Sequence, residues 1–211
     1  MKIQKKLLPV FLLFCAFMFP SCIKKGDILI QEGASAFQRK EFDKAAGLFQ
    51  MGLSDECSLD PESVYVMIAN CYSQKEEYDT AIEWRQKALA LSEDSENYLN
   101  IGMIYRIKQD DENAEAMFRK ALEIDPDNAA AYASLGALCI SSNRIDEAIP
   151  LLEDAEAINP RSGIIHADLA ICYARKGDFE KATEQLELAE DYKVENLAAF
   201  KAEISDLQSG R

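Results

Sequence analysis

Small side chains recur along this chain with a period of about 34 residues. One row of small residues, separated by 36, 33, 34 and 34 positions, consists of Gly33, Ala69, Gly102, Gly136 and Ala170. A second row with the same four separations consists of Ala45, Ala81, Ala114, Ala148 and Ala182. Two independent rows with one set of gaps indicate five copies of one structural unit.

Each copy contains two apolar-periodic stretches of about 13 residues joined by a short polar turn, which predicts a pair of helices. The predicted turns are Lys40-Glu41, Glu76-Glu77, Gln109-Asp110, Asn143-Arg144 and Gly177-Asp178. Between copies, prolines end the helical patterns at Pro61, Pro126 and Pro160, because proline lacks the backbone N–H that a helix needs. One helical pair is too small to bury its apolar face alone, so neighbouring pairs are expected to stack.

The third copy carries the most complete motif, with bulky, small and proline positions at Tyr98, Ile101, Gly102, Tyr105, Ala114, Phe118, Ala121 and Pro126. This pattern resembles the tetratricopeptide repeat (TPR). The resemblance implies an all-α fold, a right-handed α-solenoid of five helix-turn-helix repeats over residues 26–194. Residues 195–211 are then expected to form a capping helix and tail, with an apolar stripe at Leu197, Phe200, Ile204 and Leu207.

The first 21 residues differ from the rest of the chain and are interpreted as a signal peptide. Met1 to Lys6 is a short basic segment, and the thirteen residues from Leu7 to Phe19 carry no charge. The apolar run is short for a membrane-spanning helix, although counting through Ile23 extends it to seventeen residues and leaves an uncleaved anchor as an alternative.

The segment from Phe19 to Cys22 resembles a bacterial lipobox, in which a Cys after a small residue becomes the lipidated N-terminus. Ser21 fits that pattern, whereas Phe19 stands where Leu is usual. The resemblance implies a lipoprotein that is attached to a membrane of the bacterial cell envelope through Cys22, with residues 22–25 as a short tether. A plain secreted protein with an incidental cysteine is the alternative.

The chain has a formal charge of −14. Without residues 1–21, which hold three Lys and no acid, 20 basic residues face 37 acidic ones, and the charge becomes −17. So acidic a surface repels nucleic acid and anionic lipid headgroups, and we expect no nucleic-acid partner.

The residues that could carry chemistry are few, and no catalytic, metal or cofactor motif is recognised. The only histidine, His166, occupies a slot that Tyr65, Tyr98 and Tyr132 hold in other repeats, so a packed residue is expected rather than a pH switch or metal ligand. The cysteines after Cys22 are expected to be free buried thiols, with one candidate disulfide, Cys57 to Cys71. We therefore predict a protein without enzymatic activity and without cofactors.

In the TPR family, the first helices of the repeats line a concave face that binds peptides. By this resemblance the peptide-binding groove would be lined by Val66, Met67, Asn70, Leu99, Asn100, Met103, Arg106, Ala133, Ala137, Ile140 and Ile171. Asp168 and Arg175 would lie on the same face. Some relatives clamp a peptide carboxylate with two Asn and several cations, and Asn70 and Asn100 match the Asn slots. The cation slots instead hold Val66, Ala130 and Ser134, so this clamp is expected to fail.

Three functional classes remain open at this stage. The first is a scaffold that docks partner proteins or peptides during envelope or secretion-machinery assembly. The second is a ligand-binding accessory of a transporter, which predicts a small pocket near Met67, Met103 and Ile107. The third is a structural protein that assembles with further copies of itself into a homo-oligomer.

Overall fold

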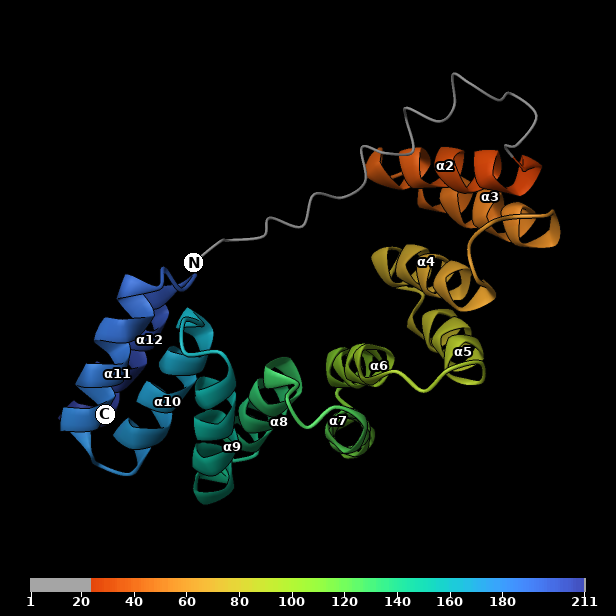
Figure 1. The fold of residues 1–211 in the computed structure, drawn as a ribbon. Coiled ribbons are helices and arrows are strands. Elements are labelled where there is room, and N and C mark those ends of the chain that lie inside the picture. The colour runs from red at the N-terminus through yellow and green to blue at the C-terminus, as the bar shows by residue number, and fades with distance from the viewer. Residues whose placement is uncertain (1–23, 211) are drawn as a thin grey trace, which may run out of the picture. The chain divides into compact units, whose positions relative to one another are not determined.

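The computed structural model describes residues 24–210, and this part of the chain is helical without strands (Figure 1). Eleven helices are present in it: α2 (Lys25–Gln38), α3 (Phe42–Ser54), α4 (Pro61–Gln74), α5 (Tyr78–Leu89), α6 (Ser95–Ile107), α7 (Asp111–Ile124), α8 (Ala129–Ser141), α9 (Ile145–Ile158), α10 (Gly163–Arg175), α11 (Phe179–Asp191) and α12 (Leu197–Ser209). The first ten form five antiparallel pairs, each a helix-turn-helix repeat, and the predicted all-α solenoid class is confirmed.

Each turn inside a repeat contains one residue with a left-handed backbone. The residues are Lys40, Glu76, Gln109, Asn143 and Gly177, and their φ angles lie between 56° and 79°. Each is the first residue of a turn that the sequence predicts. Only the fifth is glycine, so the other four turns hold a side chain in a conformation that costs an L-residue about 1 kcal/mol or more.

The chain divides into two compact bodies, Met1–Ser92 and Glu93–Arg211. The N-terminal body contains α2 to α5. Its core includes Phe49, Val64, Ile68 and Cys71, which are buried. A Cβ atom at Gly33 would lie 2.6 Å from the Phe49 ring, so helices α2 and α3 approach each other closely at this point.

The C-terminal body contains α6 to α12 and repeats the same packing. A Cβ atom at Gly102 would lie 2.5 Å from the ring of Phe118, and one at Gly136 would lie 2.7 Å from Leu152. Phe118 and Leu152 are fully buried. Gly102 and Gly136 therefore lie where two helices cross so closely that no side chain fits.

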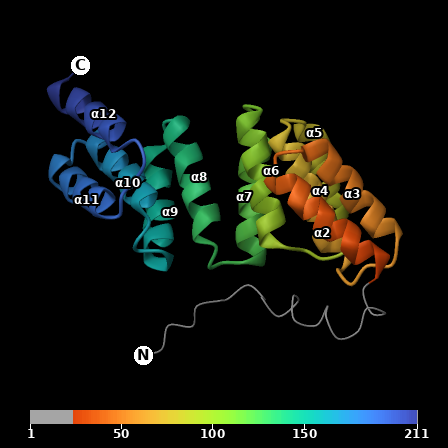
Figure 2. The ribbon, with the colours of Figure 1, turned by 90° about the horizontal axis from the view of Figure 1, so that it is seen from above.

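Helix α12 packs beside α10 and α11 at the C-terminal end of this body (Figures 1 and 2). Ile204 of α12 lies in one buried cluster with Ala170, Ile171 and Ala182. In addition, the Arg175 guanidinium of α10 donates to the Ile140 carbonyl at 3.0 Å and to Glu203 Oε1 of α12 at 2.8 Å. Both apolar and polar contacts thus hold α12 against the last repeat.

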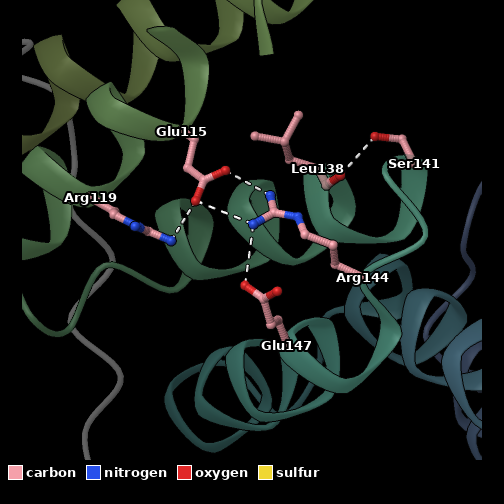
Figure 3. A network of polar contacts seen from close by, with 6 residues as sticks. All are labelled: Glu115, Arg119, Leu138, Ser141, Arg144 and Glu147. Atoms are coloured by element: carbon pink, nitrogen blue, oxygen red, sulfur yellow. Dashed lines mark hydrogen bonds and ion pairs between the residues drawn. The ribbon is translucent and has the colours of Figure 1, made fainter. Parts of the chain in front are cut away.

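A polar network joins α7 to the turn between α8 and α9 (Figure 3). Arg144 Nη2 lies 2.6 Å from Glu115 Oε2, and Arg144 Nη1 lies 3.2 Å from Glu147 Oε2. Arg119 also pairs with Glu115. Because these hydrogen bonds favour the ionised carboxylate, the pKa of Glu115 is lowered, chiefly by Arg144.

None of the helices in the described range is long and apolar enough to cross a bilayer.

Candidate functional site: the first-helix face

The eleven predicted groove residues lie on the first helices of repeats two to five. Three belong to the N-terminal body, on α4. The other eight belong to the C-terminal body, on α6, α8 and α10. The exposed or half-buried residues that these three helices of the C-terminal body contribute are called the first-helix face below: Asn100, Met103, Arg106, Ala133, Ala137, Ile140 and Asp168.

On α4 the three predicted residues are half-buried and partly used by the fold. Met67 packs against the core of the N-terminal body. Asn70 Oδ1 accepts a hydrogen bond of 2.6 Å from Arg85 Nη2, and Arg85 is only 4% exposed. The side chain of Asn70 is thus held by a neighbouring guanidinium, and only its Nδ2 group is left to donate to a peptide carboxylate.

On α6 the face is open to solvent. Met103 is 48% exposed and Ile107, one turn further along the helix, is 58% exposed. Asn100 Nδ2 donates to the Glu96 carbonyl oxygen at 2.7 Å and to Glu96 Oε1 at 3.0 Å, so this second clamp asparagine is also engaged within its own helix.

Two of the predicted residues, Leu99 and Ile171, are buried. Leu99 is 4% exposed and packs with Ala114, Phe118 and Leu135. Ile171 is 3% exposed and packs with Ile204 of α12. Their side chains support the face from below and are not available to a ligand, because the positions assigned from the family pattern do not account for the neighbours that cover them here.

Helix α8 contributes small side chains to the face. Ala133 and Ala137 are half-buried, as is Ile140, which packs against the clusters on both sides of α10. The two alanines leave the backbone of α8 thinly covered between the larger residues of α6 and α10.

Asp168 of α10 adds a carboxylate to this face. It is half-buried, and among the described residues it has no hydrogen-bond or ion-pair partner. Burial raises the pKa of its carboxyl to about 7; the nearby positive charge of Arg106 opposes that shift, and the negative charge of Glu203 adds to it. Sequence reasoning placed Asp168 on this face but gave it no role, because burial and missing partners are not visible in a repeat pattern.

His166 is buried on the same helix and packs as the sequence predicts. Its Nε2 lies 3.0 Å from the Pro160 carbonyl oxygen, its Nδ1 lies 2.7 Å from Gln185 Oε1, and its ring stacks on Tyr192 at 5.4 Å. Both ring nitrogens are therefore occupied by protein groups.

The four cysteines of the described range, Cys57, Cys71, Cys139 and Cys172, are free. Burial raises the pKa of Cys71 to about 11 and that of Cys172 to about 12, which disfavours the reactive thiolate. Within the described range no group of His, Cys, Asp and Glu has a metal-binding arrangement.

Two surface depressions are lined by residues that do not belong to the first-helix face. One, of about 440 Å³, is lined by the start of α10 and by the α11–α12 connection, including Ile164, Val194 and Phe200. The other, of about 480 Å³, lies on α2 and α3, with Gln31, Arg39 and Leu48 in its lining. The proposed lipidation site, Cys22, lies outside the described residues.

Family models of the tetratricopeptide repeat match residues 60–124, 94–161 and 140–204. The chain belongs to the tetratricopeptide repeat family. The matches together run from α4 into α12, and the helix pair α2–α3 precedes them.

Curated proteins resemble part of the chain. Anaphase-promoting complex subunit 3 of Schizosaccharomyces pombe is 27% identical over 59% of this chain and 19% of that protein. Heat shock protein STI1 of Saccharomyces cerevisiae is 31% identical over 50% of this chain and 18% of that protein. The chain spans only about a fifth of the length of these relatives.

Solved structures of TPR proteins share the fold. A crystal structure of MamA has a TM-score of 0.66 and 20% identity, covering 76% of this chain and 94% of MamA. YrrB, described as a TPR protein with an unusual peptide-binding site, has a TM-score of 0.62 and 22% identity, covering 82% of this chain and 89% of YrrB. Together with the family matches, these likenesses support a protein-interaction scaffold.

Proposed function

We propose that the chain is an exported TPR lipoprotein without enzymatic activity, which docks partner proteins or peptides during the assembly of the bacterial envelope or of a secretion machine. The observation that supports docking most directly is the open first-helix face of the C-terminal body. Met103 of this face and Ile107, one turn further along α6, are exposed, whereas the equivalent side of α10 is covered by its neighbours. TPR folds typically serve as scaffolds, and no metal-binding cluster occurs in the described range.

The lipid would hold this acidic protein at a membrane. Its surface charge repels anionic headgroups, so attachment must come from acyl chains rather than from basic patches. Helix α2 begins at Lys25, so only two residues would separate a lipidated Cys22 from the first repeat. The repeats would then work close to the bilayer of the cell envelope.

Docking is tested by site-specific photo-crosslinking in the native cell. A photoreactive phenylalanine analogue is placed at Met103 of the first-helix face or at Asp154, an exposed control position on α9. We expect discrete adducts with other proteins from position 103, and their loss when Ala137→Glu places a charge on the face. Equal adducts from both positions, or adducts unchanged by Ala137→Glu, would contradict the proposal.

Two other functions are distinguished by the same adducts. Adducts of the chain with itself, together with a concentration-dependent mass in sedimentation, would indicate a self-assembling protein. Adducts with a membrane transporter would indicate a transporter accessory.

The lipid is tested by growing cells with radiolabelled palmitate. Label should enter the wild-type protein and the Cys15→Ala control, and should be absent from Cys22→Ala. Equal labelling of Cys22→Ala and the wild type would contradict attachment at this residue.

A further inference from the structure

We infer that Asp168 makes the first-helix face selective for peptide segments that carry a Lys or Arg side chain. The inference rests on the proposed docking function and names the chemistry of the partner. It begins from a carboxylate that the fold keeps half-buried without giving it a hydrogen-bond or ion-pair partner among the described residues.

Two of the charged groups near Asp168 are already paired with each other. Arg175, two turns further along α10, is engaged by Glu203 Oε1 at 2.8 Å and by the Ile140 carbonyl oxygen at 3.0 Å. Glu203 is therefore already paired. Arg175 and Glu203 thus neutralise each other, and the Asp168 carboxylate remains available to a group of a bound peptide.

Two charged groups, each on a different helix, act on Asp168. Arg106 of α6 attracts the carboxylate from a distance, without an ion pair, and Glu203 of α12 repels it. On α10 itself, burial raises the pKa of the Cys172 thiol, and the negative charge of Asp168 adds to that increase. Neither Arg106 nor Arg175 contacts Asp168 closely enough to neutralise it.

Burying a carboxylate without a partner is costly, and here the cost appears as a pKa raised to about 7. A cationic group that reaches Asp168 would relieve that cost and would form a charge-assisted hydrogen bond in a partly desolvated place. A neutral or acidic group would leave the cost in place or increase it. The same position therefore favours a basic ligand and disfavours an acidic one.

The surroundings of Asp168 suit a basic residue on an otherwise apolar segment. Helix α8, which contacts both α6 and α10, contributes the small side chains of Ala133 and Ala137 to this face, and α6 contributes the exposed and adaptable side chain of Met103. The long aliphatic stems of Lys and Arg can cover such a surface while the cationic end reaches a carboxylate. The charge of −14 also attracts basic segments over a distance.

A library of random heptapeptides displayed on phage tests the inference. It is selected at pH 8 on the full chain, purified in a non-ionic detergent, and on three variants. Asp168→Asn removes the charge with little change of shape. Asp154→Asn removes an exposed carboxylate from α9 as a matched control, and Ala137→Glu identifies peptides that occupy the face.

Peptides selected on the wild type should share a Lys or Arg at one position, bind Asp154→Asn equally well, and lose binding to Ala137→Glu. Synthetic copies should bind Asp168→Asn about 10- to 100-fold more weakly, the range expected for a hydrogen bond to a charged group. Replacing the basic residue of the peptide by Gln should weaken binding to the wild type by a similar factor, with little further loss on Asp168→Asn.

The wild type alone provides a second measurement, which does not depend on how a variant folds. Lowering the pH from 8 to 6 protonates most of a carboxyl with a pKa near 7, and should weaken binding of the basic peptide about ten-fold. The Gln-containing peptide should bind with nearly the same affinity at both values.

The two proposals fail in different ways. If selected peptides depend on Ala137 but share no basic position, or bind Asp168→Asn as tightly as the wild type, the role of Asp168 is wrong and peptide docking stands. If no peptide is enriched, or all bind Ala137→Glu equally, peptide docking on this face is wrong as well.

Discussion

Helices α6 and α10 occupy the same position in their repeats, with Gly102 and Ala170 in the same slot, yet their surroundings differ. Within the C-terminal body, α10 contacts α8, α9, α11 and α12, and nine of its thirteen residues are buried. Helix α6 contacts α7 and α8 in that body, and it exposes Met103 and Ile107. The repeat motif therefore determines where helices form and cross, and the neighbours decide which first helix offers a surface.

The largest expected effect distinguishes the buried side of α6 from its exposed side by the loss of unfolding free energy that a substitution causes. Phe118 of α7 is fully buried against Gly102, so Phe118→Ala should lower the free energy of unfolding by about 3–5 kcal/mol. Met103→Ala, on the open side, should change it by less than about 0.5 kcal/mol. Urea denaturation followed by circular dichroism measures both. Similar losses from the two substitutions would show that Met103 is also part of a packed core.

The next test concerns the charge on α10. The pKa of Asp168 is about 7 in the folded protein against a reference value of 3.8, so the unfolded chain loses this proton first as the pH rises. The contribution of Asp168 to the free energy of unfolding should therefore decrease between about pH 4 and pH 7 and then level off.

In Asp168→Asn this decrease should be smaller, and the variant should exceed the wild type at pH 8 by on the order of 2 kcal/mol, with no difference near pH 4. Urea unfolding at a series of pH values measures the difference in unfolding free energy between the variant and the wild type. Asp154→Asn is the control for removing one negative charge. A wild-type pH profile that Asp168→Asn leaves unchanged would mean that Asp168 titrates normally.

A third, smaller effect is expected where α7 meets the α8–α9 turn. The side chains of Arg144 and Glu115 are 30% and 22% exposed, so their two-point contact is partly shielded from water. A double-mutant cycle with Arg144→Gln and Glu115→Gln should give a coupling energy of about 1 kcal/mol. The Arg119–Glu115 pair, whose arginine side chain is 57% exposed, should give less than half of that. A larger coupling energy for Arg119–Glu115 than for Arg144–Glu115 would show that Arg119, and not Arg144, is the main ion-pair partner of Glu115.

The last comparison concerns the turns that follow α6 and α10. Gln109 and Gly177 both have positive φ angles, 59° and 79°, but only Gly177 adopts this conformation without a Cβ penalty. Gln109→Gly should raise the free energy of unfolding by about 0.5 kcal/mol, and Gly177→Gln should lower it by about 1 kcal/mol. Thermal unfolding measures both changes. Stabilisation by Gly177→Gln would show that the backbone of the last turn differs from that of the others.

Much of the fold follows from the period of the sequence. Local features of the sequence predict the helix crossings, the turns and the last helix. They are the small residues Gly102 and Gly136, the polar turns at Gln109 and Asn143, and the apolar stripe of α12. The accessibility of the site is not local. Leu99 and Ile171 fit the pattern of ligand-facing positions, but Phe118 and Ile204 cover them from other helices. The missing partner of Asp168 likewise depends on three helices, which no single repeat encodes.

Three repeats each contain a buried cysteine whose labelling can report local unfolding of that repeat. Cys71, Cys139 and Cys172 belong to the second, fourth and fifth repeats, and each is at most 1% exposed. An alkylating reagent can reach such a sulfur atom only when the helices around it separate, so the labelling rate measures how often that repeat opens. The unmodified chain can thus reveal, by mass spectrometry of its peptides, whether the repeats come apart together or one at a time.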